Sequence, residues 1–490
     1  MEWCDQAMIV ANYGLIYFTP ISIALVESFA GFALFFFFVK RGMAFYVHLK
    51  DLLLRGISPS FLGKVRLFFS SFKPVENYLN WPMGVFILAG FVSILFSKYP
   101  LLSLKGFFFK LLEWTFLYFI FVECVRTRKR LKIFMLVFLV SAILVIASGL
   151  VQGMTKVDFI RGYASSDGRI TSSFNHANDL GAYLLVVTLI SIAFVFFNGH
   201  KDFLKIKKRS AWLSFVLRVS SIVFSLLCMV CLGLTYSRGA WAAFFVSLIF
   251  LGLLRIKKIY ISFLFIIFFI AVFFPGLEKK RNVYFATDTV TVQTQVKQDS
   301  PAPSPKPAPT PLSESPQKIN TSHPVMFSEK PDVFKHHPQK LAWGETLKSF
   351  RASGRETFWR NSVGIIRRFP FGIGLNTYSR VSHEYDFAYG YPHNCYLQLT
   401  AEMGFFGLFA FIWIIIALFK NSIGNLRQIK DPLLSSLLLG SLAGLFGFLI
   451  HSGVDTNFYS VQLGNFMWLV MGIVVASQKI GLPANNERTK

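Results

Sequence analysis

Long apolar runs recur along this chain, and they restrict its fold more than any other feature. A run of roughly 18 or more apolar residues can cross the hydrocarbon core of a bilayer, which is about 30 Å thick. The sequence predicts spans near 12–39, 80–97, 106–125, 132–152, 181–198, 219–236, 240–254, 259–276, 402–419, 433–452 and 461–478. We therefore predict an all-α polytopic membrane protein with about 11–12 transmembrane helices.

Basic residues indicate the orientation of these spans. Lys and Arg number 50, against 25 Asp and Glu. If residues 40–73 are cytoplasmic, alternating spans place four further basic clusters on the same side: 126–130, 201–209, 255–258 and 420–430. This agreement with the positive-inside rule accounts for the basic charge, so no nucleic-acid partner is expected. It also predicts an inner-membrane protein with a cytoplasmic C-terminus.

The stretch 9–39 leaves two arrangements open. It holds about 31 apolar residues interrupted by Pro20 and Glu27, which is too long for one upright span and short for two. One tilted helix would put the N-terminus outside the cytoplasm, and a tight hairpin would put it inside. Because no basic region precedes the stretch and no small-residue cleavage site follows it, we expect retained membrane helix and no removable signal peptide.

The spans divide the chain into an N-terminal bundle, one large extracytoplasmic loop, C-terminal helices and a short tail. The predicted ranges are 1–276, 277–401, 402–478 and 479–490. Within the loop, the alternating prolines of 301–311 mark 292–340 as an extended linker. Residues 341–368 have helical amphipathic spacing, which fits either a helix at the membrane face or a surface helix packed on the bundle.

Three basic side chains outside the cytoplasm are candidates for chemistry. Arg169 lies in an outer loop with Arg161, His176 and Asn178, and Arg238 lies in a tight junction between two spans, where its planar guanidinium would suit phosphate. His393 follows Pro392 near a predicted helix start, and an imidazole can exchange a proton near neutral pH. Together they predict a binding edge for a phosphate-bearing substrate at one membrane face.

Each of these residues also fits a structural role. Arg238 would then pair with a lipid headgroup or a carboxylate such as Glu402, and His393 would cap a helix. Asp455 and His451, near the last outer turn, either line the acceptor side or pack between helices. Five scattered cysteines form no disulfide or metal-binding pattern, and the outer loops contain no DxD-type carboxylate pair, so no metal and no cofactor are expected.

Three short motifs follow one another in the outer segments. They are Arg169 with Phe174, His176 and Asn178; Ser237, Arg238 and Gly239; and Pro370, Gly372 and Gly374 followed by His393, Asn394, Glu402 and Gly404. In order, spacing and topology they resemble the O-antigen ligase and polysaccharide polymerase family of bacterial membrane proteins, over roughly 130–475. The Pro-rich 292–340 is not part of that family's pattern.

The resemblance implies a fold like that of metal-independent GT-C-type membrane glycosyltransferases. The donor would be an undecaprenyl-diphosphate-linked glycan, and the acceptor a sugar hydroxyl of lipid A-core or of a growing polysaccharide. Arg169 and Arg238 would hold the diphosphate, with Arg161 as an auxiliary. His393 would accept the proton of the attacking hydroxyl, which predicts inversion, and Asn394 would orient it. His176, Asn178 and Glu402 are the remaining expected substrate-binding residues.

Two other classes of protein stay open. A polysaccharide flippase or transporter would place charged or broken-helix sites near mid-membrane, often in two repeated halves. In this sequence the main ionisable residues within spans are Lys110, Glu113 and Glu27, and no repeat of halves is evident. A non-catalytic component that binds envelope-glycan assembly proteins is favoured if Arg169, Arg238 and His393 lie far apart. The motifs do not separate ligase from polymerase.

Overall fold

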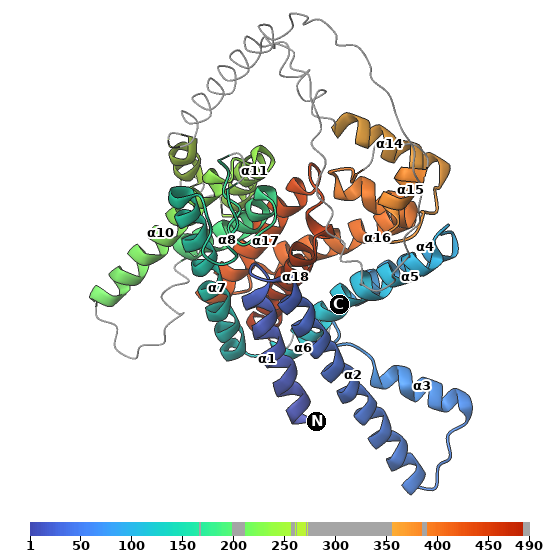
Figure 1. Ribbon diagram of the computed structural model, residues 1–490. Coiled ribbons are helices and arrows are strands. Elements are labelled where there is room, and N and C mark those ends of the chain that lie inside the picture. Colours follow the sequence, from blue (N-terminus) through green and yellow to red (C-terminus); the bar gives the residue numbers. More distant parts are fainter. Residues whose placement is uncertain are drawn as a thin grey trace, which may run out of the picture. The chain divides into compact units, whose positions relative to one another are not determined.

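The computed structural model describes residues 1–165, 168–197, 211–255, 355–384 and 390–483, with parts of 260–272. Across these residues the chain is helical without a β-strand, and seven helices are long and apolar enough to cross a membrane (Figure 1). The seven are α2 (Ile23–Leu54), α7 (Arg128–Thr155), α8 (Ala177–Phe197), α10 (Ala211–Leu234), α16 (Cys395–Asn425), α17 (Pro432–His451) and α18 (Val461–Gly481). The predicted class, an all-α polytopic membrane protein, is confirmed.

Two shorter apolar helices complete this set, α4 (Asn80–Leu95) and α11 (Arg238–Leu254). All elements discussed below belong to one unit, formed by Met1–Phe269 with Arg351–Lys490. The predicted Pro-rich linker 292–340 and the first half of the amphipathic segment, 341–354, lie outside the described residues.

The N-terminal stretch forms a helical hairpin. Helix α1 (Glu2–Phe18) ends two residues before Pro20, which has no N–H to extend a helix, and α2 begins at Ile23. The Lys40 Nζ on α2 lies 2.6 Å from the Asp5 Oδ1 near the start of α1. The two helices are therefore antiparallel, and the predicted single span 12–39 is divided between them. The N-terminus lies at the same end of the bundle as Lys40.

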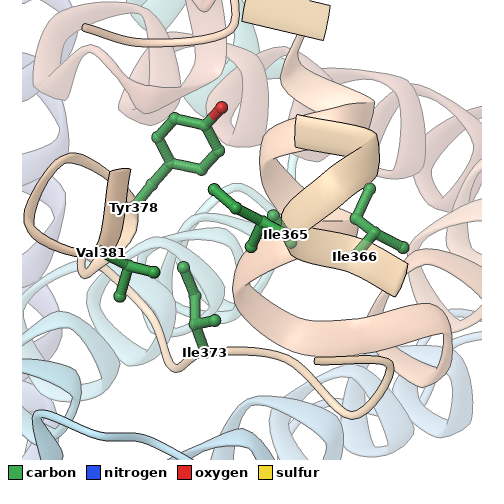
Figure 2. Packing of buried hydrophobic residues seen from close by; sticks show 6 residues of the cluster. Ile365, Ile366, Ile373, Tyr378 and Val381 are labelled. Atoms are coloured by element: carbon green, nitrogen blue, oxygen red, sulfur yellow. The ribbon is translucent and has the colours of Figure 1, made fainter. Parts of the chain in front are cut away.

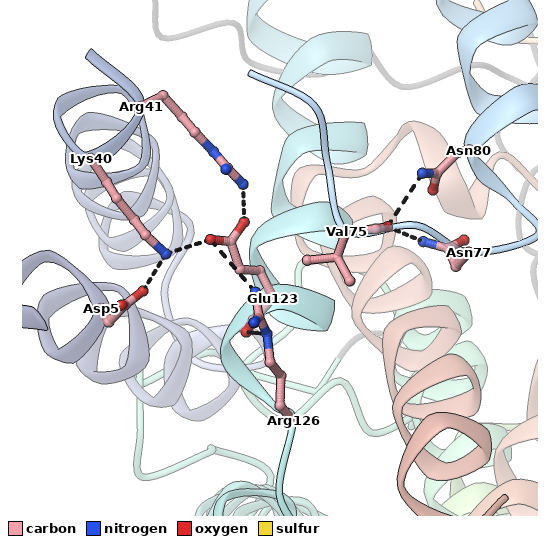
Figure 3. A network of polar contacts seen from close by, with 8 residues as sticks. All are labelled: Asp5, Lys40, Arg41, Val75, Asn77, Asn80, Glu123 and Arg126. Atoms are coloured by element: carbon pink, nitrogen blue, oxygen red, sulfur yellow. Dashed lines mark hydrogen bonds and ion pairs between the residues drawn. The ribbon is translucent and has the colours of Figure 1, made fainter. Parts of the chain in front are cut away.

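A buried carboxylate gathers basic residues at this end of the bundle (Figure 3). The Glu123 side chain, at the end of α6 (Glu113–Cys124), is 3% exposed. The Lys40 Nζ lies 2.5 Å from its Oε1, Arg41 pairs with its Oε2, and the Arg126 Nη2 lies 3.9 Å from its Oε1. A buried carboxylate needs such charge partners. Two of the basic clusters assigned to the cytoplasm thus meet at one end of the helices.

Helices α8, α17 and α18 form the interior of the bundle, and most of their residues are buried. Glycines bring α17 close to α8: a Cβ atom on Gly440 would lie 2.6 Å from the Ile190 Cα, and one on Gly444 would lie 2.9 Å from the Val186 Cγ1. Small residues spaced by four are a common means of close helix packing in membranes. This rigid centre carries the chain segments that form the site.

The predicted span 106–125 belongs to a longer helical segment. It consists of α5 (Pro100–Gly106), a π-helical turn η1 (Phe107–Leu112) and α6. The π-turn places the Lys110 Nζ 2.7 Å from the Asn376 Oδ1. Earlier in the chain, α3 (Phe61–Ser71) is capped by Ser60, whose Oγ accepts a hydrogen bond from the Gly63 N–H.

Two helices of the segment predicted to be extracytoplasmic pack on the first turns of α16. They are α14 (Arg355–Arg368) and α15 (Tyr378–Glu384). Figure 2 shows the small apolar core between them, in which Ile365 of α14 lies beside Tyr378, Val381 and Ile373. Ile365 is fully buried. The amphipathic helix predicted around 341–368 is thus present over its second half, where it packs on the bundle.

Helix α16 is interrupted at Gly404, whose φ of 67° and ψ of −177° are not helical. The loop between α14 and α15 fills the break with its own backbone. The Ile373 N–H donates to the Ala401 carbonyl at 2.9 Å, and the Gly374 N–H donates to the Glu402 carbonyl at 2.9 Å. A helix break within a bundle is tolerated where neighbouring groups satisfy the freed carbonyls, as they do here.

Glycine is required on both sides of this contact. A Cβ atom on Gly372 would lie 2.4 Å from the Glu402 carbonyl oxygen, and one on Gly404 would lie 2.7 Å from the Phe371 carbonyl carbon. Both residues also have positive φ, which disfavours any side chain. The Pro-x-Gly-x-Gly motif therefore locks the outer helices onto α16. Because α16 begins at Cys395, the loop predicted to reach 401 ends earlier, and the predicted span 402–419 starts within this helix.

Candidate functional site

Four chain segments meet at one end of the bundle. They are the α7–α8 loop (156–176), the α10–α11 junction (235–237), residues 390–394 before α16, and residues 452–456 after α17. Backbone hydrogen bonds join them in pairs: the Ile170 N–H donates to the Leu234 carbonyl at 3.3 Å, and the Cys395 N–H donates to the Ser452 carbonyl at 2.8 Å. Since α7 runs from near Glu123 toward the α7–α8 loop, this end is opposite the Lys40–Glu123 cluster.

Arg169 is held against the α10–α11 junction. Its Nε donates to the Thr235 carbonyl at 2.8 Å, and its Nη2 donates to the Asn178 Oδ1 at 2.7 Å. The Asn178 Nδ2 in turn donates to the Asp455 Oδ2 at 2.7 Å. Two of the predicted site residues are therefore brought together, and they connect to an aspartate that the sequence left unassigned.

Asp455 joins the arginine side of the site to the histidine. Its Oδ1 accepts a hydrogen bond from the Thr456 N–H at 2.8 Å and lies 3.5 Å from the Nδ1 of His393. Burial alone would raise the pKa of Asp455, but the His393 contact, the charge of His451 and the Thr456 N–H outweigh burial and lower this pKa to about 2. Asp455 is thus a carboxylate at any physiological pH. Arg169, Asn178, Asp455 and His393 are called the Asp455 network below.

His393 has a strained backbone and a partly exposed ring. Its φ is 47°, in the left-handed region that non-glycine residues rarely occupy. The side chain is 44% exposed, while its Nδ1 is buried on the side of Asp455. The Phe358 ring of α14 packs edge-on against the imidazole, with 5.9 Å between the ring centroids. The histidine is therefore fixed on one side by Asp455 and on another by α14, and its ring remains accessible.

Asn394 fixes the backbone next to His393. Its Oδ1 accepts hydrogen bonds from the Tyr396 and Leu397 N–H groups at 3.0 Å each, which caps α16, and its Nδ2 donates to the Gly453 carbonyl at 2.9 Å. The amide ties the start of α16 to the segment that carries Asp455. These contacts favour a positioning role for Asn394.

Arg238 is the first residue of α11 and is exposed. Ser237 caps this helix, and Arg238 makes no hydrogen bond or ion pair with the described residues. Its neighbour Gly239 lies close to α17: a Cβ atom there would be 3.0 Å from the His451 Cδ2 and 3.0 Å from the Val454 Cγ2. Arg238 therefore projects at the helix N-terminus, which itself attracts anions, beside the segment that carries Asp455.

Arg355 is a further basic residue that sequence reasoning missed. It lies on the same face of α14 as Phe358, Ser362 and Ile365, at the spacing of three and four residues that defines one helix face. Phe358 touches His393, so this face of α14 borders the site. Arg355 could have been selected from the sequence, because it is an arginine at an apolar-face position of a predicted amphipathic helix.

Two predicted residues lie away from the Asp455 network. Arg161 Nη1 donates to the Asn175 Oδ1 at 3.2 Å and stacks over Tyr163, within the α7–α8 loop. His176 is exposed, and its backbone carbonyl accepts from the first N–H groups of α8. Within the described part of the chain, neither side chain contacts the network.

Glu402 lies in a different environment. It is 1% exposed, and its Oε1 accepts hydrogen bonds at 3.3 Å from the Tyr378 N–H and from the Gln398 Nε2. It lines a small internal cavity together with Lys110 and Asn376, below the loop that fills the α16 break. The structure does not bring Glu402 to His393, and its contacts support the packing of α15 on α16.

The described residues contain no group of three or more His, Cys, Asp or Glu side chains placed to hold a metal ion. Guanidinium groups and the N-terminus of α11 supply positive charge at this site.

Comparison with known families agrees with the motifs. Residues 222–412 match the family model described as O-antigen ligase. The match includes Ser237 to Gly239, the Pro-x-Gly-x-Gly lock and His393, so the resemblance to the O-antigen ligase and polymerase family is confirmed. Arg169 and Asp455 lie outside the matched range, but each contacts a residue within it: Arg169 contacts Thr235, and Asp455 contacts His393. A search of curated proteins found no match.

Proposed function

We propose that this protein is a membrane glycosyltransferase of the O-antigen ligase and polymerase type. It transfers glycan from an undecaprenyl-diphosphate-linked donor to a sugar hydroxyl, of lipid A-core or of a growing polysaccharide, on the extracytoplasmic face. The observation that carries the proposal is the Asp455 network, which links a phosphate-suited arginine to an accessible histidine. The family match at 222–412 supports the same reaction class.

The donor diphosphate would lie between Arg238 and Arg169. The Thr235 carbonyl and the Asn178 amide hold the guanidinium of Arg169 in place, which fixes a positive charge beside the α10–α11 junction. Arg238 can offer its whole planar fork. Two fixed guanidiniums stabilise the negative charge that grows on the leaving diphosphate, which is the task a divalent cation performs in other transferases.

His393 would be the general base. If its Nδ1 carries the proton that faces Asp455, its Nε2 has a free lone pair for the acceptor hydroxyl. The acceptor oxygen attacks the anomeric carbon as the bond from that carbon to the diphosphate oxygen breaks, and the hydroxyl proton moves to Nε2. Undecaprenyl diphosphate leaves, the proton passes to solvent, and the single displacement inverts the anomeric centre. Asp455 would hold the required tautomer and stabilise the imidazolium.

The contacts favour this reading over the two alternatives. Arg169, Arg238 and His393 far apart would favour an assembly component, whereas hydrogen bonds and close packing connect their chain segments. A transporter would place charged or broken-helix sites near mid-membrane. The break in α16 is instead filled by the backbone of residues 370–374.

The test is glycan transfer in liposomes from an undecaprenyl-diphosphate donor with EDTA present. Arg238→Ala is expected to lose about 10²–10³-fold, the usual cost of removing one transition-state charge partner. His393→Ala is expected to lose about 10²–10⁴-fold, as for a general base. Arg66→Ala and His48→Ala are matched controls, because both residues are exposed and belong to α3 and α2 beyond the Lys40–Glu123 cluster. Full activity in the two site variants would refute the proposed site.

A further inference from the structure

A cavity of about 400 Å³ lies between α7, α8 and α10, away from the Asp455 network. This volume falls within the range of ligand pockets. Its walls are the middle turns of the three helices, and they include Phe138, Ala142, Val187, Phe194, Leu217 and Phe224. It is called the α7–α8–α10 groove below.

The groove exists because α10 joins the bundle only near its end. Cys228 and Cys231 are fully buried, whereas Val219 and Val223, earlier on the helix, are 41% and 48% exposed. In Figure 1 the first turns of α10 extend away from the other helices. The space that this leaves against α7 and α8 faces the hydrocarbon of the membrane.

The chemistry of the groove suits a hydrocarbon chain. The Ser221 Oγ donates to the Leu217 carbonyl at 2.8 Å, and the Ser191 Oγ donates to the Thr188 carbonyl at 2.8 Å. These hydroxyls are satisfied within their own helices, as is usual for serine in membrane helices. Most of the groove wall is therefore side-chain hydrocarbon, with the Ser220 hydroxyl as a further polar group in the lining.

The position of the groove relates it to the arginines. At 1.5 Å per residue, Phe224 and Leu217 lie about 15 Å and 25 Å before the end of α10, which Arg238 follows closely. Val187 and Phe194 lie about 15 Å and 25 Å from the start of α8, just after the loop that carries Arg169. The groove thus begins at a similar depth on both helices, below the two guanidiniums.

We infer that the α7–α8–α10 groove binds the polyisoprenoid chain of the lipid-linked donor, while the donor diphosphate is held at Arg169 and Arg238. The inference rests on the proposed function, because it takes the lipid carrier from it. A chain that starts at the arginines and descends along α8 and α10 reaches the groove after about 15 Å of helix. Its far units then occupy apolar space that the bundle leaves unfilled.

The test compares two donors that carry the same glycan, one on undecaprenyl diphosphate and one on geranyl diphosphate, whose tail is too short to enter the groove. Leu217→Trp fills the groove, and Val223→Trp is the matched control on an exposed, non-lining position of the same helix. Leu217→Trp should lower kcat/KM for the long donor at least about tenfold, equivalent to roughly two methylene groups left unburied. The short donor should be used equally by wild type, Leu217→Trp and Val223→Trp. Equal loss with both donors, or no loss with the long one, would overturn the inference.

A binding measurement separates this inference from the proposed reaction. Undecaprenyl phosphate that carries a photoreactive group in the middle of its chain is crosslinked to the wild-type protein in nanodiscs, and the labelled peptides are identified. Labelling within 135–143, 187–194 and 217–224 that excess phospholipid does not displace supports the groove, even if no transfer is detected and the proposed function fails. Labelling elsewhere, or displacement by ordinary phospholipid, assigns the groove to bulk lipid and refutes the inference.

Discussion

Replacing Asp455 with asparagine tests the centre of the site with almost no change of shape. Both carboxylate oxygens accept hydrogen bonds, Oδ2 from the Asn178 Nδ2 and Oδ1 from the Thr456 N–H. An amide has one oxygen and one NH2 group, so either orientation places its NH2 group against a donor. Leaving a buried donor without a partner costs about 1–3 kcal/mol. The change also removes the charge that faces His393.

The lowered pKa gives an independent magnitude. The difference between the ordinary value of 3.8 and about 2 corresponds to about 2 kcal/mol in favour of the folded state. Because the Thr456 N–H contributes both to this shift and to the hydrogen-bond term, about 2 kcal/mol is an upper limit. We expect Asp455→Asn to lower the free energy of unfolding by about 1–2 kcal/mol. We also expect it to lower kcat by about 10²-fold or more, because His393 loses its orienting partner.

The assay is glycan transfer together with a thermal melt in detergent. Asp431→Asn is the matched control, since Asp431 caps the other end of α17, where asparagine caps equally well. Its ion pair with Arg128 is 26% exposed on each side, so its loss costs little. The control should keep full activity and nearly full stability. If Asp455→Asn keeps kcat within about threefold of wild type, the orienting role assigned to this carboxylate is wrong.

Three further outcomes concern the pH dependence of Asp455, the helix break at Gly404 and the basic side chain of Arg355. Because the folded-state pKa of Asp455 is lowered, its contribution to stability is present above pH 3.8 and is lost as the pH falls through about 2. The difference in melting temperature between wild type and Asp455→Asn should therefore shrink over that pH range and persist at pH 6. Gly404→Ala should lower the free energy of unfolding by more than about 3 kcal/mol and the melting temperature with it. The new Cβ atom would overlap the backbone of Phe371, and alanine disfavours the positive φ at this position. Gly424→Ala in the same helix, with open space around it, should be neutral or stabilising. Arg355→Gln should raise the KM for the diphosphate-linked donor about tenfold at unchanged melting temperature, and Arg360→Gln on the exposed face of α14 should not.

The membrane class could be predicted from the sequence because each span is a local property of about 20 residues. The division of 9–39 could not, since Pro20 is compatible with a tilted kinked helix as well as with a hairpin. The structure adds the deciding contact, between Asp5 and Lys40. A helix start next to Pro392 could be predicted, and α16 begins there, at Cys395 after its cap Asn394. The boundary at 402, which hydropathy alone sets, lies within this helix.

The site was predictable in part. Arginines that the predicted topology places outside the cytoplasm stand out against the positive-inside rule, so Arg169 and Arg238 could be selected from the sequence alone. Asp455 could not be selected in the same way, because a single carboxylate after a helix is ordinary, and its partner Asn178 is far away in the chain. In the sequence, the Pro-x-Gly-x-Gly segment and Glu402 belong to the same motif as His393. Their contacts fix the break in α16 and the packing of α15, so residues of one sequence motif need not share one role.

The Ser-Arg-Gly junction connects the chain segments that carry the two arginines. Ser237 caps α11 and fixes where the helix begins, so Arg238 projects from its first turn. The Thr235 carbonyl, two residues before this cap, accepts the hydrogen bond from Arg169. Gly239 lets the same turn approach His451 so closely that a Cβ atom would require its neighbours to move. A larger residue at 239 would therefore shift Arg238 and the Arg169 acceptor together, away from the segment that carries Asp455.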